Sequence, residues 1–168
     1  LFYTGGFYMF GFLKRKTENK IYAPVKGVCL SLSEVNDQVF SSKMMGEGVA
    51  FRFDGDEIYA PCSGEVILIA STKHALGIRT ENGTEVLLHI GLETVNLQGQ
   101  GFEVLVQAHD KVKVHQPLVS IDRQLMDEQK IDLILPMVIT NTNDYEIRVY
   151  DETQTVNCNS IVMETMKR

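Results

Sequence analysis

The sequence after Asn19 consists of short apolar or alternating runs separated by turn signals such as Asp54-Gly55-Asp56, Asn82-Gly83 and Asn141-Thr142-Asn143. Many short strands at close spacing are typical of an all-β sandwich or barrel. Helical periodicity is nearly absent, and only residues 33–40 and 123–130 could form a turn or two of helix. The predicted strands cover residues 27–32, 49–53, 65–71, 75–80, 85–90, 112–114, 118–122, 134–140 and 145–149.

One sequence pattern occurs twice. Residues 22–28 (YAPVKGV) return as residues 59–66 (YAPCSGEV), with a proline followed three residues later by a glycine in both copies. That spacing suits a turn leading into a strand. Two copies are too few for a solenoid, so they indicate a duplicated supersecondary unit within one barrel.

The chain has the length of one domain, which we expect to cover residues 20–168. Residues 1–19 are expected to form a flexible tail. Met9 is expected to be the natural start, so that residues 1–8 are upstream sequence. Residues 1–13 are uncharged and precede Lys14-Arg15-Lys16, the reverse of the order in a secretory signal. This segment is too short to span a bilayer and could at most touch a membrane surface weakly.

The net charge indicates which kinds of binding partner to expect, and the cysteines indicate the redox state of the compartment. The net charge is −6 and there is no basic stripe, which argues against nucleic-acid binding and favours a basic partner. The cysteines, Cys29, Cys62 and Cys158, form no CxxC pair, so a zinc knuckle or redox motif is not expected. Three scattered cysteines fit a reducing cytoplasm.

Asn82-Gly83 predicts a β-hairpin with these two residues as its loop, since this dipeptide is the strongest short-range hairpin signal. Leu76 would then lie opposite His89, and His74 opposite Gly91. His74 and Leu76 would share a face with Leu87 and His89, which makes the two histidines diagonal neighbours about 7–8 Å apart. This inference depends on the register of the hairpin.

The same register makes two further predictions. Thr72 continues the row of His74, so its hydroxyl could hold a ring nitrogen of that histidine. Val86, Leu88 and Ile90 point to the opposite face, which should be the core.

Two neighbouring imidazoles allow three interpretations. A neutral imidazole can accept a phosphoryl group on nitrogen, and the second can stabilise that group by hydrogen bonding. The pair could instead bind zinc, although two histidines leave such a site short of ligands. It could also be a polar surface ladder without chemistry. His109 and His115 lie in polar, turn-rich sequence and are expected to be solvated, and P-loop, GxGxxG and GxSxG motifs are absent.

The sequence around these histidines closely resembles the glucose-type IIA component of the bacterial phosphoenolpyruvate-dependent sugar phosphotransferase system. The resemblance rests on LLHIGLETV at residues 87–95 and TKHA at 72–75, and it runs in order from about Ile21 to the C-terminus. It is also carried by Ala23-Pro24 with Gly27, Gly46-Glu47-Gly48-Val49-Ala50, Ala60-Pro61 with Gly64, and Gly99-Gln100-Gly101-Phe102.

The resemblance implies an antiparallel β-sandwich of the duplicated-hybrid-motif type. The oligomeric state is open, although a small carrier that meets several partners gains from being a monomer. The resemblance also implies that His89 is phosphorylated on Nε2, that His74 stabilises the phosphoryl group and that Thr72 orients His74. The donor would be the small carrier HPr, and the acceptor a cysteine of the IIB domain of a glucose-class permease. No cofactor is implied, and zinc could bind His74 and His89 only with a ligand from a partner.

The family's docking face is an apolar patch ringed by acids. Phe40, Met44, Met45 and Leu87 match its apolar positions, and Asp37 and Glu93 match its acids. Glu93 replaces a usual aspartate and Ala70 a common aromatic, which affects partner preference rather than the chemistry.

The sequence lacks residues that two other functions require, and it leaves a third function open. A zinc endopeptidase on a similar fold needs a His-x-His pair, which His89-Ile90-Gly91 does not provide. A biotinyl or lipoyl carrier needs a lysine at a hairpin tip, where this chain has Asn82-Gly83. A regulatory module that binds through the same apolar face without phosphoryl transfer is the alternative that stays open.

Overall fold

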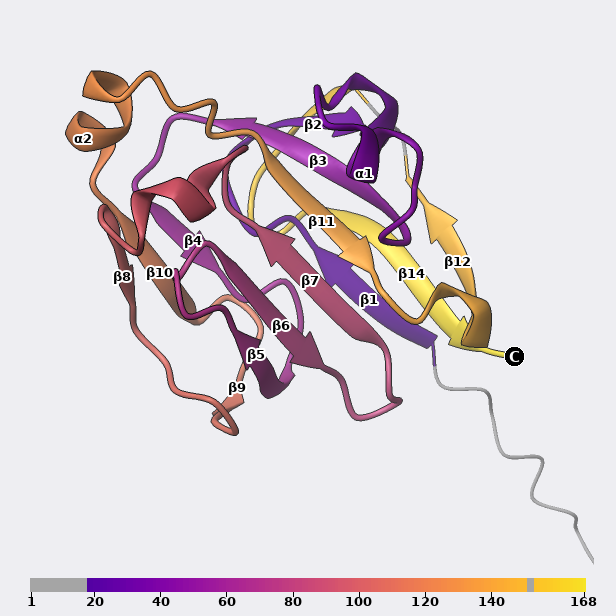
Figure 1. The fold of residues 1–168 in the computed structure, drawn as a ribbon. Helices are drawn as coiled ribbons and strands as arrows, with labels where there is room; N and C mark the ends of the chain where they lie inside the picture. The colour runs from indigo at the N-terminus through magenta and orange to yellow at the C-terminus, as the bar shows by residue number, and fades with distance from the viewer. Residues whose placement is uncertain (1–17, 151–152) are drawn as a thin grey trace, which may run out of the picture.

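The computed structural model describes residues 18–150 and 153–168, and strands make up most of that part of the chain (Figure 1). The longest sheet has the order β13-β2-β3-β11-β7-β6-β5-β9, with every pairing antiparallel. Its strands are β13 (Gln154–Val156), β2 (Gly27–Ser31), β3 (Glu47–Phe53), β11 (Leu135–Ile139), β7 (Glu85–His89), β6 (Ala75–Arg79), β5 (Gly64–Ile69) and β9 (Lys111–Val112).

Two smaller antiparallel sheets cover one side of this sheet. One has the order β1-β14-β12, formed by Glu18–Tyr22, Ile161–Lys167 and Tyr145–Val149. The other has the order β4-β10-β8, formed by Glu57–Tyr59, Pro117–Ile121 and Phe102–Val104. The main core lies between the long sheet and the two small ones, because all three contribute buried residues to a single cluster.

Helix is confined to short connections within the described residues. There are two α-helices, α1 (Gln38–Ser41) and α2 (Arg123–Glu128), and three 3-10 turns, η1 (Leu32–Glu34), η2 (Thr94–Leu97) and η3 (Thr142–Asp144). The prediction of an antiparallel β-sandwich with little helix is therefore confirmed.

All of the predicted strands overlap observed ones, and five strands were missed: β1, β4, β8, β13 and β14. Three of these are only three residues long, which is too short to show alternation. In β14 the buried Glu164 and Thr165 interrupt the apolar pattern that a core strand normally shows. The predicted tail at residues 1–19 lies mostly outside the described residues, and β1 already begins at Glu18.

The repeated sequence pattern is also a structural repeat. The Tyr22 amide donates to the Pro61 carbonyl over 2.8 Å, and the Tyr59 amide donates to the Pro24 carbonyl over 2.9 Å. Each copy thus holds the other through its first and third residues. Each copy also leads into a hairpin of the long sheet, β2–β3 or β5–β6, and these hairpins lie at equivalent places on either side of the central pair β11–β7.

The glycine that follows the proline by three residues in each repeated pattern is required by close backbone packing. A Cβ atom on Gly27 would lie 2.0 Å from the Arg52 carbonyl oxygen, and one on Gly64 would lie 2.2 Å from that of Arg79. Neither position leaves room for a side chain unless the neighbouring strand moves. The duplication therefore preserves one packing constraint at two places.

We expect Gly27→Ala and Gly64→Ala each to lower the free energy of unfolding by about 3 kcal/mol, because overpacking against backbone forces strands apart. In a protein of this size that loss corresponds to a melting temperature lower by roughly 6–12 °C. Gly55→Ala is the matched control, since nothing lies within 4 Å of a Cβ atom there. Thermal unfolding that does not separate these variants from the control would contradict the packing argument.

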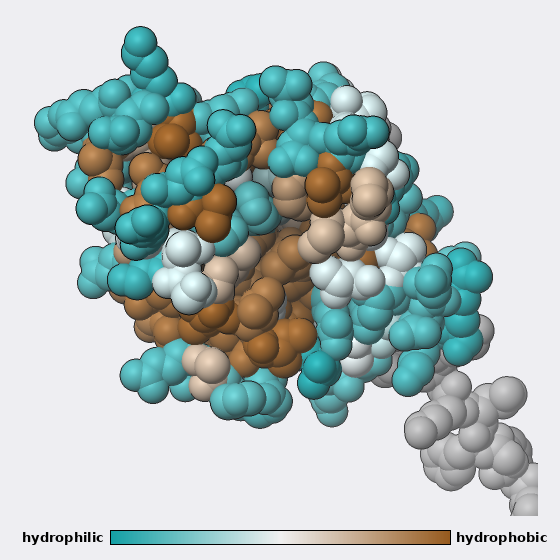
Figure 2. Space-filling model, in the orientation of Figure 1, coloured by the Kyte–Doolittle hydropathy of each residue, from teal (hydrophilic) through white to brown (hydrophobic). Residues whose placement is uncertain are grey.

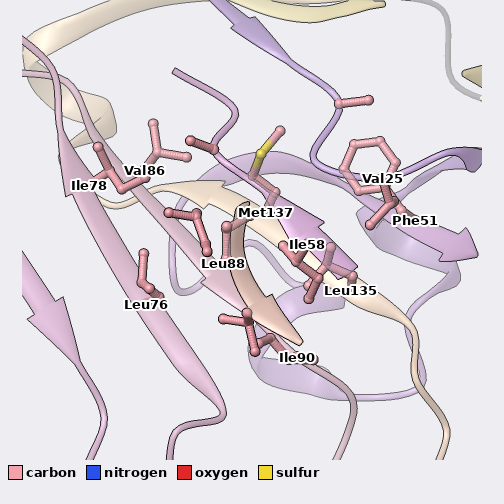
Figure 3. Packing of buried hydrophobic residues seen from close by; sticks show 14 of the residues in the cluster. Val25, Phe51, Ile58, Leu76, Ile78, Val86, Leu88, Ile90, Leu135 and Met137 are labelled. Atoms are coloured by element: carbon pink, nitrogen blue, oxygen red, sulfur yellow. The ribbon is translucent and has the colours of Figure 1, made fainter. Parts of the chain in front are cut away.

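The main core contains the residues predicted for it from β7 and its extension: Val86, Leu88 and Ile90 (Figure 3). A second, smaller cluster lies on the outer face of the long sheet, beneath η1 and α1 (Figure 1). It includes Phe40 from α1, Ala75 from β6 and Leu87 from β7. Side chains of β6 and β7 thus alternate between the main core on the inner face and the smaller cluster on the outer face. This alternation decides on which face a histidine of these strands can lie.

Candidate functional site

His89 is the last residue of β7 and lies on the outer face of the long sheet, opposite Ala75. Its ring packs on Phe40, with a centroid distance of 4.9 Å. Its Nδ1 atom is 2.9 Å from the carbonyl oxygen of Gly91. A carbonyl only accepts, so Nδ1 carries the proton of the neutral ring and Nε2 keeps its lone pair.

Gly91 makes this arrangement possible, whereas from the sequence it stands out only as a small residue beside the histidines. Its backbone has φ +75°, and a Cβ atom there would lie 2.7 Å from Thr94 Cγ2. Glycine adopts positive φ without the clash that other residues meet. The chain can therefore turn back after β7 and direct the Gly91 carbonyl at the imidazole. A glycine two residues after a histidine was the available signal.

His74 meets His89 from the turn that precedes β6. The ring centroids are 5.0 Å apart and the rings are nearly perpendicular, at 77°. The Thr72 hydroxyl is 2.6 Å from His74 Nδ1, as the sequence predicted. When the hydroxyl donates, the proton of His74 lies on Nε2, where it is available to a group bound at His89.

The predicted hairpin register was wrong by one residue. His89 pairs with Ala75 and Leu76 pairs with Leu88, so Leu76 points into the main core rather than sharing the face of the histidines. His74 precedes β6 and reaches His89 from a turn in which Lys73 has φ +59°. The two histidines do meet, but through this turn and not through strand alternation.

Burial keeps both histidines neutral. It is the main cause that lowers the pKa of His89 below the ordinary 6.5, and the nearby His74 lowers it further. The bond to Gly91 and the charge of Asp37 act in the opposite direction. Burial also lowers the pKa of His74. A neutral His89 is the nucleophilic form, so the site is ready for reaction at neutral pH.

We expect NMR titration to give midpoints below 6.5 for both histidines. Asp37→Asn should lower the midpoint of His89 further, because it removes a negative charge that favours the protonated ring. In the window just below pH 6.5 the unfolded chain binds more protons than the folded one. The free energy of unfolding is therefore highest, as far as these histidines are concerned, above pH 6.5, and it decreases as the pH falls through that window. A midpoint for His89 at or above 6.5 would contradict this account.

The structure distributes the predicted partner-binding residues over two layers. Phe40 and Leu87 are buried, at 3% and 7% exposure, and support the site from beneath. Met44 is 74% exposed and Met45 37%, both in the turn after α1.

The two predicted acids lie on separate segments. Asp37 caps α1, accepting from the Val39 amide over 2.9 Å, and lies near enough to His89 to shift its pKa. Glu93 is exposed at the start of η2, with φ +56°.

Further exposed apolar residues were missed from the sequence. Leu68 is 46% exposed, Val39 41% and Val95 50%. A bulge between Val66 and Leu68 shifts the register of β5, so Leu68 pairs with Gly77 on the outer face. Figure 2 shows an apolar surface in the middle of this face, surrounded by polar side chains. The residues of β5 carry no sequence signal for this bulge.

Other chemistry-bearing residues lie apart from this site. His109 and His115 are exposed, as predicted, and His109 is 3.1 Å from a Glu65 carboxylate oxygen. Among the described residues, no group of three or more His, Cys, Asp or Glu side chains could hold a metal ion. Cys29 and Cys62 are buried, and burial raises the pKa of Cys62 to about 12. No helix in the described part of the chain is long and apolar enough to cross a membrane.

The fold and the site together define a class of protein: an antiparallel β-sandwich that presents two neutral imidazoles beside an apolar surface. The sequence matches the family model of the phosphoenolpyruvate-dependent sugar phosphotransferase system, EIIA 1, over residues 19–145. The chain belongs to this family, and the resemblance to glucose-type IIA components is confirmed.

Individual relatives agree with this assignment. The chain is 40% identical to a glucose-specific EIIA component of Staphylococcus epidermidis, an alignment that covers 88% of this chain and 90% of the relative. It is 46% identical to a glucoside-specific EIICBA component of Staphylococcus carnosus, over 77% of this chain but only 19% of that longer protein. The solved structure of glucose permease IIA from Mycoplasma capricolum superposes with a TM-score of 0.81 at 34% identity, covering 88% of this chain and 96% of that one.

Proposed function

We propose that this chain is a phosphocarrier that receives a phosphoryl group from phospho-HPr on His89 and passes it to the IIB domain of a glucose-class permease. Family membership supports the general role. The observation that carries the assignment to His89 is the bond from its Nδ1 to the Gly91 carbonyl, which leaves the Nε2 lone pair as the nucleophile. The three scattered cysteines of the sequence fit a reducing cytoplasm as the place where it works.

In the loading step the Nε2 lone pair of His89 attacks phosphorus and forms an N–P bond. The donor's bond to phosphorus breaks, and its electron pair stays with the donor. The acceptor of the second step then attacks phosphorus, and the pair of the N–P bond returns to Nε2. No oxidant or cofactor is needed, since phosphoryl transfer depends mainly on positioning and on charge stabilisation.

His74 supplies that stabilisation in this proposal. With Thr72 donating to its Nδ1, its Nε2–H can donate to an oxygen of a phosphoryl group on His89. A preorganised donor of this kind lowers the barrier because it needs no reorientation during the reaction. Thr72 thus orients the ring and does not touch the phosphoryl group.

The surroundings of the site suit a partner with an apolar contact and a basic rim. Met44, Val39 and Leu68 are exposed and apolar, whereas Asp37 and Glu93 contribute negative charge. The net charge of −6 acts in the same direction. Complementary charge speeds association and fixes orientation more than it adds affinity.

Intact-mass spectrometry tests this function directly. The chain is incubated with phosphoenolpyruvate, Enzyme I and HPr, and then mixed with a purified IIB domain. We expect one acid-labile phosphoryl adduct that disappears when IIB is added. Absence of the adduct, with HPr shown to be phosphorylated, would refute the carrier role and favour the regulatory binding module.

A further inference from the structure

The peptide group that orients the His89 ring has a hydrogen-bond partner of its own on a distant segment. The Gly91 carbonyl and the Leu92 amide belong to one planar unit, and in a trans peptide they point in opposite directions. The carbonyl oxygen is 2.9 Å from His89 Nδ1, and the amide donates to the Asp132 carbonyl over 2.9 Å. The Asp132 carbonyl therefore helps to set the direction in which the Gly91 carbonyl points.

The same segment holds the peptide group before Gly91. The Gly91 amide donates to the Ile134 carbonyl over 3.0 Å, so carbonyls from residues 132 and 134 hold the peptide groups on both sides of the Gly91 Cα atom. Glycine has more backbone freedom than other residues, and Gly91 has φ +75°. These bonds from outside the loop therefore restrict a position that is mobile by nature.

The carboxylate of Asp132 closes the short turn that offers these two carbonyls. Its Oδ1 atom accepts from the Ile134 amide over 3.1 Å, which joins the two residues whose carbonyls face Gly91 and Leu92. An aspartate or asparagine that bonds the backbone two residues further on forms such a turn. The turn lies in the connection between α2 and β11, and β11 begins only at residue 135 (Figure 1).

The bonds form a chain that ends at the reacting ring. It runs from His89 Nδ1 through the Gly91–Leu92 peptide group to the Asp132 carbonyl. Hydrogen bonds in such a chain polarise one another, so donation by the Leu92 amide makes the Gly91 carbonyl a stronger acceptor. A stronger acceptor favours the neutral tautomer with its proton on Nδ1, the one that keeps the lone pair on Nε2.

We propose that Asp132 is a positioning residue whose carboxylate holds the turn at residues 132–134, and that this turn keeps the Gly91 carbonyl directed at His89 Nδ1. The proposal assigns no contact between Asp132 and either the ring or the phosphoryl group. Its effect on phosphorylation rests on the proposed phosphocarrier function, whereas its effect on the His89 tautomer does not.

Asp132→Asn and Asp132→Ala separate the turn from the charge. Asparagine keeps an oxygen that can accept from the Ile134 amide, but it loses the ion pair with Arg52, whose Nη1 atom is 3.3 Å from Asp132 Oδ1. Alanine loses both. Asp110→Ala is the matched control, because the Asp110 carboxylate accepts from the Gln107 amide over 2.8 Å in the exposed turn before β9. This control removes the same kind of bond from another segment.

Two measurements follow the effect from the ring to the reaction. Long-range ¹H–¹⁵N spectra of the unphosphorylated protein, recorded above pH 7, report which nitrogen of His89 carries the proton. Rapid mixing with phospho-HPr, followed by intact-mass spectrometry, reports the rate at which the phosphoryl group is accepted. The spectra detect a change at His89 that a general loss of stability would not produce.

We expect Asp132→Ala to give a mixture of His89 tautomers and roughly tenfold slower phosphorylation, less than the roughly hundredfold loss that a displacement of about 1 Å can cause. Asp132→Asn should keep the proton on Nδ1 and a rate within about twofold of the unsubstituted chain, because an exposed ion pair contributes little. Asp110→Ala should match the unsubstituted chain in both measurements.

Three results would overturn the proposal. An asparagine variant as impaired as the alanine variant would show that the charge, and not the turn, is essential. An alanine variant with a single His89 tautomer and a normal rate would show that the turn holds without the carboxylate. An equal loss in Asp110→Ala would show a general defect.

This proposal and the carrier function can fail separately. If the unsubstituted chain gains no phosphoryl adduct, the carrier function is wrong, while the spectra still test whether Asp132 controls the tautomer of His89. If the adduct forms and Asp132→Ala keeps one tautomer and a normal rate, the carrier function stands and the role of Asp132 is wrong.

Discussion

Replacing His89 by alanine is expected to abolish phosphorylation completely. The Gly91 carbonyl holds the proton of His89 on Nδ1, so the lone pair of His89 Nε2 is available to accept the phosphoryl group. Alanine offers no such atom. His74 offers no substitute, since its Nδ1 is engaged by Thr72 and its Nε2 then carries the proton. Intact-mass spectrometry after incubation with phosphoenolpyruvate, Enzyme I and HPr measures the outcome.

His109→Ala is the matched control for this experiment. His109 is an exposed histidine outside the site, so its loss should leave the adduct unchanged. An adduct that persists in His89→Ala would show that another residue accepts the phosphoryl group. A loss in both variants would point to a general defect and not to a specific acceptor.

Replacing His74 by glutamine is expected to preserve phosphorylation of His89 and to slow transfer from His89 to IIB. His89 keeps its bond to Gly91, so the variant should still load to completion after long incubation. Onward transfer to IIB should slow by about 10²–10³-fold, the usual cost of removing one preorganised donor from a site of developing charge. Glutamine can offer an N–H group, but it lacks the Nδ1 atom through which Thr72 fixes the ring.

A rapid-mixing assay with pre-phosphorylated protein and purified IIB measures this rate. His115→Gln is the control, since it makes the same change at an exposed histidine elsewhere. Onward transfer at the same rate in His74→Gln as in the control would remove His74 from the proposed mechanism. The stabilising group would then have to come from the partner.

Much of the fold could be predicted from the sequence because its strands have local signals. The apolar runs at residues 85–90 and 134–140 became β7 and β11, the central pair of the long sheet. The repeated YAP pattern correctly indicated a duplicated unit, whose copies bond to each other through Tyr22 and Tyr59. Three of the missed strands have only three residues, and β14 carries the buried Thr165, whose partner Thr84 lies far along the chain.

The register of the hairpin between β6 and β7 could not be predicted in the same way. Asn82-Gly83 indicated a two-residue loop, but the last paired residues are Thr80 and Thr84, which leaves three residues in the loop. Asn82 Oδ1 accepts from the Thr80 hydroxyl over 2.6 Å and holds this wider loop together. The Tyr145 hydroxyl donates to the Asn82 carbonyl over 2.7 Å, from a strand of another sheet.

The sequence by itself determined the all-β class, the duplication, the identity of the paired histidines and the hydroxyl that holds one of them. These features depend on residues close together in the chain, or on a repeat that is visible in the letters. The tertiary structure decided the register, the bulge that exposes Leu68 and the turn from which His74 reaches His89. The hairpin loop is held by a contact between segments distant in sequence, the bond from the Tyr145 hydroxyl to the Asn82 carbonyl, and such a contact can outweigh the local preference of a loop for one register.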